Sequence, residues 1–199
     1  EKDSEVLELS RKIAESNGLE SKIEFIEWNS FDVTLPEKAT VLLMETFGDL
    51  ALEYNLLGCV LDSRRRNLSS SAKFIPESVD LYLVSFYSDR IFNAHNGFWK
   101  NIFGIDYTDV KMKADHLPYM TNVNPDEFVG NPQCFLSFDL QRIASSHVRS
   151  TIKFSFAEPT LITGFAGFFE TKLSDNNVFS TRPGTKNNSF RQYCFPLPQ

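Results

Sequence analysis

The sequence lacks the features that mark several large classes of protein. No apolar run approaches the roughly 18 residues that a membrane-spanning helix needs, and we expect no signal peptide. The 199 residues carry a formal net charge of −6, so there is no excess of Lys and Arg to form a broad nucleic-acid surface. We therefore expect neither a membrane span nor direct contact with nucleic acid. We expect a cytoplasmic location, with the nucleus as an additional one.

Residues that build disulfides, metal sites and common catalytic motifs are also scarce. The three cysteines, at positions 59, 134 and 194, form no Cys-x-x-Cys pair, and the three histidines have no acidic or cysteine neighbours at ligand spacing. A disulfide framework and a metal site are therefore not predicted, and a reducing compartment is the simpler interpretation. There is neither a Gly-x-Ser-x-Gly elbow for a serine nucleophile nor a Gly-x-Gly-x-Gly loop for a phosphate or cofactor.

The first third of the chain alternates helical and strand patterns. Apolar residues recur at helical spacing over residues 4–17, and Gly18 follows as a stop. Residues 22–27 alternate loosely and predict a strand. Residues 40–44 form an uninterrupted apolar run, which is typical of a parallel strand covered on both faces. Helical spacing resumes over residues 56–66, so the order helix, strand, strand, helix predicts a doubly wound α/β sheet.

The remainder of the chain is rich in strand signals. Nineteen Phe residues suit the half-buried surface of a pleated sheet. Strand patterns separated by turn-prone stretches predict an antiparallel sandwich or barrel. They cover residues 73–76, 79–84, 134–140, 151–156, 161–173, 178–180 and 192–195. We place the boundary between an α/β part, residues 1–73, and a β-rich part, residues 74–199, near residues 72–76.

Three carboxylates follow the apolar strand predicted at residues 40–44. Glu45 stands at the carboxyl end of this strand, where open α/β sheets bind ligands, and Asp49 and Glu53 follow within eight residues. Two carboxylates that converge on one pocket repel each other unless a cation lies between them. A guanidinium suits that role because its fork of donors pairs bidentately with carboxylates. The alternative is that Glu45 caps the next helix and Glu53 is a solvated helix charge.

Several segments resemble, in the same order, those of the protein arginine methyltransferases. Residues 35–48 (LPEKATVLLMETFG) are similar to the stretch that ends in the family's first substrate glutamate. Residues 74–76 resemble the family's first strand after its helix, and residues 98–106 resemble its Trp-containing dimerisation arm. Residues 161–173 and 179–183 resemble its barrel strands, especially in the branch that makes symmetric dimethylarginine. Residues 189–196 stand where most members carry a Thr-His-Trp loop.

The resemblance implies a fold and an activity. The fold would be a partial Rossmann-like methyltransferase sheet followed by an antiparallel β-barrel or sandwich domain, with a helical dimerisation arm at about residues 88–114. The activity would be transfer of a methyl group from S-adenosylmethionine to an arginine guanidino nitrogen of protein substrates, by a homodimer. The acidic net charge is compatible with such a basic substrate.

The resemblance also implies roles for particular residues. Glu45 corresponds to the first glutamate that holds the substrate guanidinium. Glu1 falls where the family has the acidic residue that binds the ribose hydroxyls of the cofactor, and Ser30 and Phe31 fall near the loop that borders the adenine. Phe190 would line the arginine channel.

Two departures from the family pattern leave a second hypothesis open. The family's second glutamate lies nine residues after the first, and that position is Tyr54 here. Glu53 is the nearest carboxylate, but a shift of one residue on a helix turns a side chain by about 100°. We therefore expect Glu53 as the second catalytic carboxylate only if the loop is one residue shorter, with Tyr54 beside the substrate. The Thr-His-Trp loop has become residues 188–190 (NSF), which lack the histidine and the tryptophan.

These departures suit a catalytically silent paralogue that binds and regulates an active partner. The resemblance further implies that the chain starts after the glycine-rich cofactor loop and would bind S-adenosylmethionine poorly alone. A small-molecule methyltransferase of another class is disfavoured by the long β-rich part. The protein substrates, and the number and symmetry of the methyl groups, are left open by the sequence.

Overall fold

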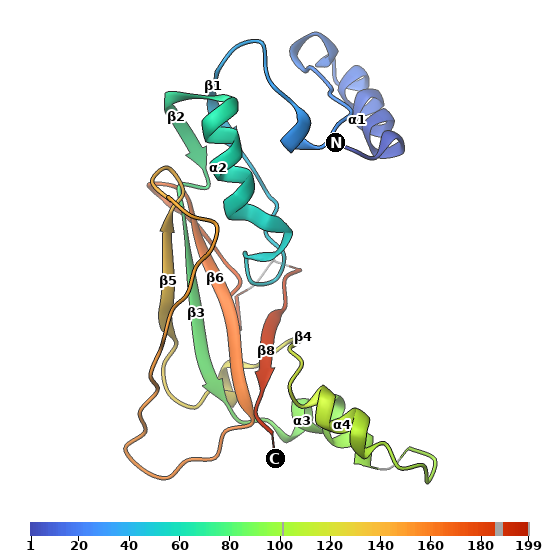
Figure 1. Cartoon of the computed structure of the whole chain (residues 1–199), viewed down its shortest axis with the longest axis vertical. Helices are drawn as coiled ribbons and strands as arrows, with labels where there is room; N and C mark the ends of the chain where they lie inside the picture. The colour runs from blue at the N-terminus through green and yellow to red at the C-terminus, as the bar shows by residue number, and fades with distance from the viewer. Residues whose placement is uncertain (101, 186–188, 199) are drawn as a thin grey trace.

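The computed structural model describes residues 1–100, 102–185 and 189–198, and Figure 1 shows its elongated shape. A small α/β unit lies at one end, a long antiparallel sheet occupies the middle, and two short helices form the other end. The helices are α1 (Ser4–Ser16), α2 (Leu56–Arg66), α3 (Asp89–His95) and α4 (Thr108–Ala114). The strands are β1 (Ala39–Leu43), β2 (Leu68–Ile75), β3 (Ser78–Phe86), β4 (Tyr119–Thr121), β5 (Gln133–Asp139), β6 (Gly164–Ser174), β7 (Asn177–Ser180) and β8 (Gln192–Pro196).

Helix α1 begins and ends where its sequence provides the expected caps. The Asp3 side chain accepts hydrogen bonds from the N–H groups of Glu5 and Val6, which have no partner inside the helix. At the other end Gly18 adopts a φ of 64°, a conformation that glycine takes without strain. The helix predicted over residues 4–17 is therefore confirmed.

Strands β1 and β2 pair in parallel, and α2 connects them, so the first third contains a β-α-β unit. The parallel strand predicted at residues 40–44 is confirmed, but its predicted burial on both faces is wrong. Val41 is 47% exposed and Leu43 is 74% exposed, because this described sheet has only two strands. The strand predicted at residues 22–27 is also wrong. Residues 20–22 form a 3-10 turn, and residues 23–27 pair with no strand among the described residues.

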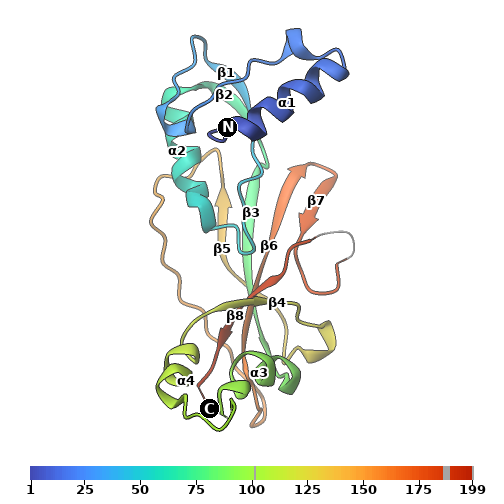
Figure 2. The same cartoon turned by 90° about the vertical axis from the view of Figure 1, so that its right-hand side faces the viewer.

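The larger sheet is antiparallel, with strand order β4-β8-β6-β3-β5, and β7 pairs with the far end of β6 (Figure 2). Among the described residues the two end strands, β4 and β5, do not pair with each other. Because side chains alternate along a strand, the sheet buries one cluster on each face. The face toward α2 contains Val79, Leu81 and Phe169, and the opposite face contains Val84 and Phe168.

One predicted strand of the β-rich part does not form. Residues 141–163, all of which the structure describes, contain neither helix nor strand. Ile152 and Phe154 are half-buried while their neighbours are exposed, and the Phe154 ring lies 4.9 Å from that of Phe165. The alternation predicted at residues 151–156 is therefore present, but no described strand pairs with it. The other strands predicted after residue 72 are confirmed, with shifts of a few residues at their ends.

The predicted arm is a pair of short helices, α3 and α4, with a 3-10 turn between them; residue 101 lies outside the described residues. A buried polar contact joins the two helices. Asn96 donates a hydrogen bond of 2.9 Å to Asp115, and Lys111 forms an ion pair with the same carboxylate. Burial acts to raise the pKa of Asp115, but the hydrogen bonds from Lys111 and Asn96 outweigh it, and the pKa lies below its ordinary value.

Candidate functional site

The segment between β1 and α2, residues 45–55, is called the junction loop here because it lies where the parallel unit meets the antiparallel sheet (Figure 1). Four of its residues have positive φ angles: Gly48 (74°), Ala51 (57°), Tyr54 (58°) and Asn55 (57°). Side chains larger than glycine seldom adopt such angles. A loop of this kind keeps its shape only where surrounding contacts hold it.

An aromatic cluster provides the main support of the loop. The Phe47 ring stacks on Phe169 of β6 with centroids 5.2 Å apart. Phe190 meets Phe169 edge-on at 5.8 Å and Phe179 of β7 at 5.6 Å. Such arrangements add to the stability gained from apolar burial alone. Phe190, which the sequence placed at an arginine channel, therefore packs into the cluster beneath the junction loop; Asn188, two residues before it, lies outside the described residues.

Two further contacts fasten the loop to the antiparallel sheet. The Leu50 side chain lies against Gly167 of β6, so closely that a Cβ at position 167 would lie 2.8 Å from Leu50 Cδ1. Asp49 Oδ1 accepts a 2.8 Å hydrogen bond from the backbone N–H of Arg191, and the guanidinium of Arg191 lies 3.9 Å from Asp49 Oδ2. Asp49 is a candidate from its spacing in the sequence, whereas no local pattern points to Arg191, because 142 positions separate the two residues.

Glu45 is the first carboxylate of the loop and follows β1 directly, two residues after its last residue. The side chain is exposed, and the structure gives it no hydrogen bond or ion pair with any described residue. Its carboxylate is therefore accessible to a cation from outside.

Glu53 behaves differently, because its carboxylate turns back onto its own loop. Both oxygens accept from the N–H of Leu50, at 3.1 and 3.2 Å, and Oε2 also accepts from the N–H of Leu52 at 3.1 Å. The next residue, Tyr54, is 76% exposed. The structure thus presents Tyr54 at the surface and engages Glu53 in the interior of the loop.

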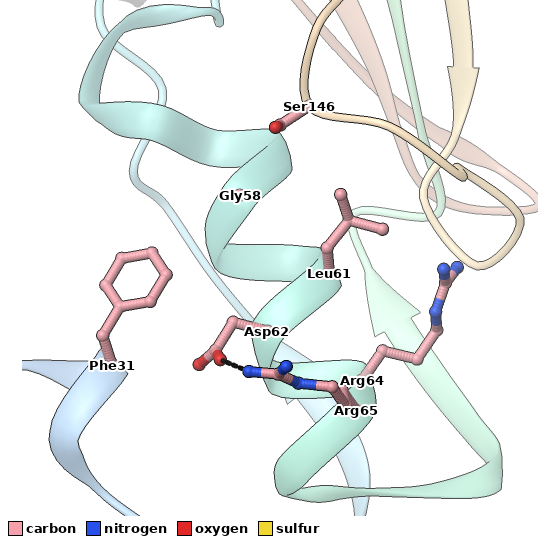
Figure 3. A pocket seen from close by; sticks show the side chains of 7 residues that line it. All are labelled: Phe31, Gly58, Leu61, Asp62, Arg64, Arg65 and Ser146. Atoms are coloured by element: carbon pink, nitrogen blue, oxygen red, sulfur yellow. Dashed lines mark hydrogen bonds and ion pairs between the residues drawn. The ribbon is translucent and has the colours of Figure 1, made fainter.

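The residues assigned to the cofactor divide between two hollows. Glu1 and Ser30 line one cavity of about 270 Å³, together with Trp28 and Val41. Glu1 Oε1 accepts hydrogen bonds from the N–H groups of the next two residues, which lower the pKa of this carboxyl, while its Oε2 accepts none from the described residues. Phe31 lies apart, in a hollow of about 660 Å³ over the outer side of α2 (Figure 3).

An ion pair on α2 fixes the segment that carries Ser30. Arg66 pairs with Asp62, one helical turn before it, and donates hydrogen bonds to the backbone oxygens of Ser30, at 2.8 Å, and Val33. The hydrogen bond from Arg66 holds the pKa of Asp62 below its ordinary range. In Figure 3 the Phe31 ring faces α2 across the hollow, and Asp62 also contacts Arg65. This pair therefore sets the position of both residues proposed near the adenine.

Other kinds of site find no support in the part of the chain that the structure describes. Within it, no three His, Cys, Asp or Glu side chains gather as they would around a metal ion. Its helices are all too short or too polar to cross a membrane.

Residues 77–199 match the protein family described as the arginine methyltransferase oligomerization subdomain. This chain belongs to the protein arginine methyltransferase family. Protein arginine N-methyltransferase 1 of Dictyostelium discoideum is 26% identical over 196 residues, which cover 96% of this chain and 58% of that protein. A probable histone-arginine methyltransferase 1.4 of Arabidopsis thaliana is 28% identical over 212 residues, which cover 98% of this chain and 40% of that protein. The chain thus spans about half the length of such relatives.

Solved structures of methyltransferases share the fold. A structure of the Trypanosoma brucei PRMT1 enzyme–prozyme heterotetrameric complex with AdoHcy matches 99% of this chain and 64% of the matched chain, with a TM-score of 0.84 and 22% identity. A structure of Arabidopsis thaliana protein arginine methyltransferase 10 has a TM-score of 0.75 and 19% identity. The match covers 97% of this chain and 65% of the matched chain. The fold is therefore that of the end of a Rossmann-like unit followed by the family's β-rich domain.

Proposed function

We propose that the whole protein transfers a methyl group from S-adenosylmethionine to a guanidino nitrogen of arginine residues in protein substrates. The observation that carries the proposal is the exposed Glu45 carboxylate at the carboxyl end of β1, without an internal partner among the described residues. A carboxylate that holds one side of a guanidinium leaves the other nitrogen available to attack the methyl carbon. As the new N–C bond forms, the bond from the methyl carbon to the sulfonium sulfur breaks, S-adenosylhomocysteine leaves, and the attacking nitrogen loses one proton to solvent. Catalysis then depends mainly on positioning and on the charge at this site.

Two residues near the start of the chain fit part of S-adenosylmethionine. Glu1 Oε2 is available as an acceptor, and a carboxylate suits ribose hydroxyls because they are hydrogen-bond donors. Ser30 lines the same cavity, whereas Phe31 borders the neighbouring hollow. We assign Glu1 and Ser30 to the ribose and adenine side of the cosubstrate. The cosubstrate itself supplies the electrophilic methyl group.

The test is Glu45→Gln in the whole protein, because glutamine keeps the size of the side chain and removes its charge. Methyl transfer to an arginine-rich peptide should fall by about 100-fold or more, the range that loss of one such group produces. The melting temperature should not change. Glu15→Gln, which neutralises an exposed carboxylate on α1, is the matched control and should transfer normally. Unchanged transfer by Glu45→Gln would remove Glu45 from the reaction.

A second candidate is a catalytically silent chain that supports an active partner. It is favoured by the inward Glu53 and by Tyr54 at the position of the family's second glutamate, together with the likeness to an enzyme–prozyme complex. The two candidates predict different results for the wild-type protein. A silent chain transfers no methyl group to any arginine peptide alone but raises the transfer rate of an active methyltransferase mixed with it.

We also propose that the whole protein forms a homodimer through the arm. The family match is to an oligomerization subdomain, and the arm exposes Phe103 (97%), Met112 (55%) and Leu117 (62%). Large apolar side chains exposed along one segment indicate a surface that a partner covers. Sedimentation should give twice the monomer mass at micromolar concentration. A monomer at that concentration would refute the proposal.

A further inference from the structure

We propose that Glu53 is a positioning residue: its carboxylate holds the junction loop in shape from inside and leaves Glu45 as the only carboxylate of that loop free to bind a guanidinium. This inference rests on the proposed function, because the guanidinium is that of the arginine substrate. It replaces the expected pair of converging carboxylates by one binding carboxylate and one that shapes the loop.

The Glu53 carboxylate accepts hydrogen bonds from the backbone of its own loop. The N–H groups of Leu50 and Leu52 belong to neither a regular helix nor a sheet ladder, and Glu53 supplies their acceptor. A buried or half-buried N–H without an acceptor is costly, so the loop depends on this carboxylate. A guanidinium could use Glu53 only by taking the carboxylate away from these backbone groups.

The Glu53 side chain also packs closely against Gly48. A Cβ at position 48 would lie 2.8 Å from Glu53 Cβ, Cδ and Oε2, so the Glu53 side chain fills the space that a larger residue at position 48 would need. Gly48 also has a φ of 74°, which glycine adopts without strain. The inward position of Glu53 is therefore built into the shape of the loop.

The remaining acidic residue of the loop is also engaged. Asp49 accepts from the backbone of Arg191 and lies beside its guanidinium, which ties the loop to the start of β8. Tyr54 is exposed, and a phenol offers no negative charge to a guanidinium at neutral pH. Of the loop's three carboxylates, two hold the protein together and one, Glu45, is free of described partners.

A site with one carboxylate should hold arginine more weakly than a site with two. Charge-assisted hydrogen bonds are about twice as strong as neutral ones. Tyr54→Glu adds a carboxylate at the exposed position without disturbing Glu53. We expect this change to tighten the binding of an arginine peptide by about tenfold. Tyr54→Gln is the uncharged reference, and Tyr54→Glu should bind the peptide about tenfold more tightly than Tyr54→Gln, because the two side chains differ only in charge.

Amide hydrogen exchange in the 199-residue chain tests the positioning role directly. Glu53→Ala should speed exchange at the Leu50 and Leu52 amides, and Glu53→Gln, which keeps one acceptor oxygen, should restore part of the protection. Glu45→Gln should leave both amides unchanged. Equal protection in Glu53→Ala and the wild-type chain would overturn the proposal.

Carbon NMR of the glutamate carboxyl groups, during titration with acetyl-Gly-Arg-Gly-amide, tests which residue meets the guanidinium. The Glu45 resonance should shift and the Glu53 resonance should not. In Glu53→Ala the Glu45 response should weaken, and in Glu53→Gln it should recover in part, which loss of stability alone would not produce. A Glu53 shift as large as that of Glu45 overturns the proposal. If neither shifts, the proposed function fails, and the exchange result still decides the role of Glu53.

Discussion

Replacing Phe169 by alanine should loosen the junction loop as well as lower the stability of the protein. Phe169 is fully buried in β6, and its ring contacts Phe47 of the loop, Phe179 of β7 and Phe190. Its ring thus contacts the rings of all three. Its removal therefore leaves a cavity directly beneath the loop.

The size of the effect follows from the burial of the ring. Phe→Ala in a core costs about 3–5 kcal/mol, through lost transfer free energy and the cavity that remains. For a chain of this length, each kcal/mol lowers the melting temperature by roughly 2–4 °C, so the expected drop is roughly 6–20 °C. Because Phe47 loses its stacking partner, the Leu50 amide should also exchange faster, even well below the melting temperature.

A matched control lies one residue earlier on the opposite face of the sheet. Phe168 is 1% exposed and stacks on Tyr82 with ring centroids 5.2 Å apart. Phe168→Ala should cost a similar unfolding free energy, measured by urea titration, but should leave the Leu50 amide protected under native conditions. If the two variants loosen the loop equally, the aromatic cluster does not position it. A loss below about 1 kcal/mol for Phe169→Ala would likewise refute the reasoning.

Three further predictions concern the loop and the arm. Gly48→Ala should lower the unfolding free energy by about 1–3 kcal/mol, because alanine would be strained at this φ and would displace Glu53. Urea titration measures this free energy, and an unchanged value would contradict the packing described. Asp115→Asn should cost about 1–3 kcal/mol at pH 7 by removing the ion pair with Lys111. Since the folded pKa of Asp115 is depressed, its contribution is present above about pH 4 and is lost as the pH falls through the folded pKa, so the two proteins should converge in stability in acid. Phe103→Ser should shift the sedimentation of the whole protein toward the monomer without lowering the unfolding free energy of the monomer itself, because this side chain is almost fully exposed there.

Local patterns predicted α1, α2 and most strands of this chain, whereas the helical arm was expected only from the family resemblance. The helix expected at residues 56–66 is found as Leu56–Arg66, because Leu56, Leu57 and Val60 form an apolar stripe that is buried on the sheet. Helical hydrogen bonds join residues four apart, so the segment itself contains the information.

Strand prediction failed where the partner strand decides the outcome. Residues 22–27 and 151–156 both show alternating patterns, yet neither pairs with a described strand. A strand forms only when it hydrogen-bonds to a partner strand, and a local pattern does not show whether such a partner is present. The same limit explains Val41 and Leu43 of β1, whose apolar run predicts coverage on both faces.

The exposed position of Glu45 after β1 was predictable, and the contacts of the residues around it were much less so. A carboxylate after an apolar strand is a local signal that places the residue at the edge of the sheet. The inward turn of Glu53 depends on positive φ angles in the loop and on contacts with β6, neither of which has a spacing pattern. The Asp49–Arg191 contact joins positions far apart in the chain and becomes visible only in three dimensions.

A crystal structure of the whole protein with an arginine-containing peptide would test the central claim most directly. We expect the guanidinium to lie about 2.7–2.9 Å from a carboxylate oxygen of Glu45, the distance of a charge-assisted hydrogen bond, while Glu53 still accepts from the backbone of its own loop. A guanidinium bound with Glu45 pointing away from it would contradict the account.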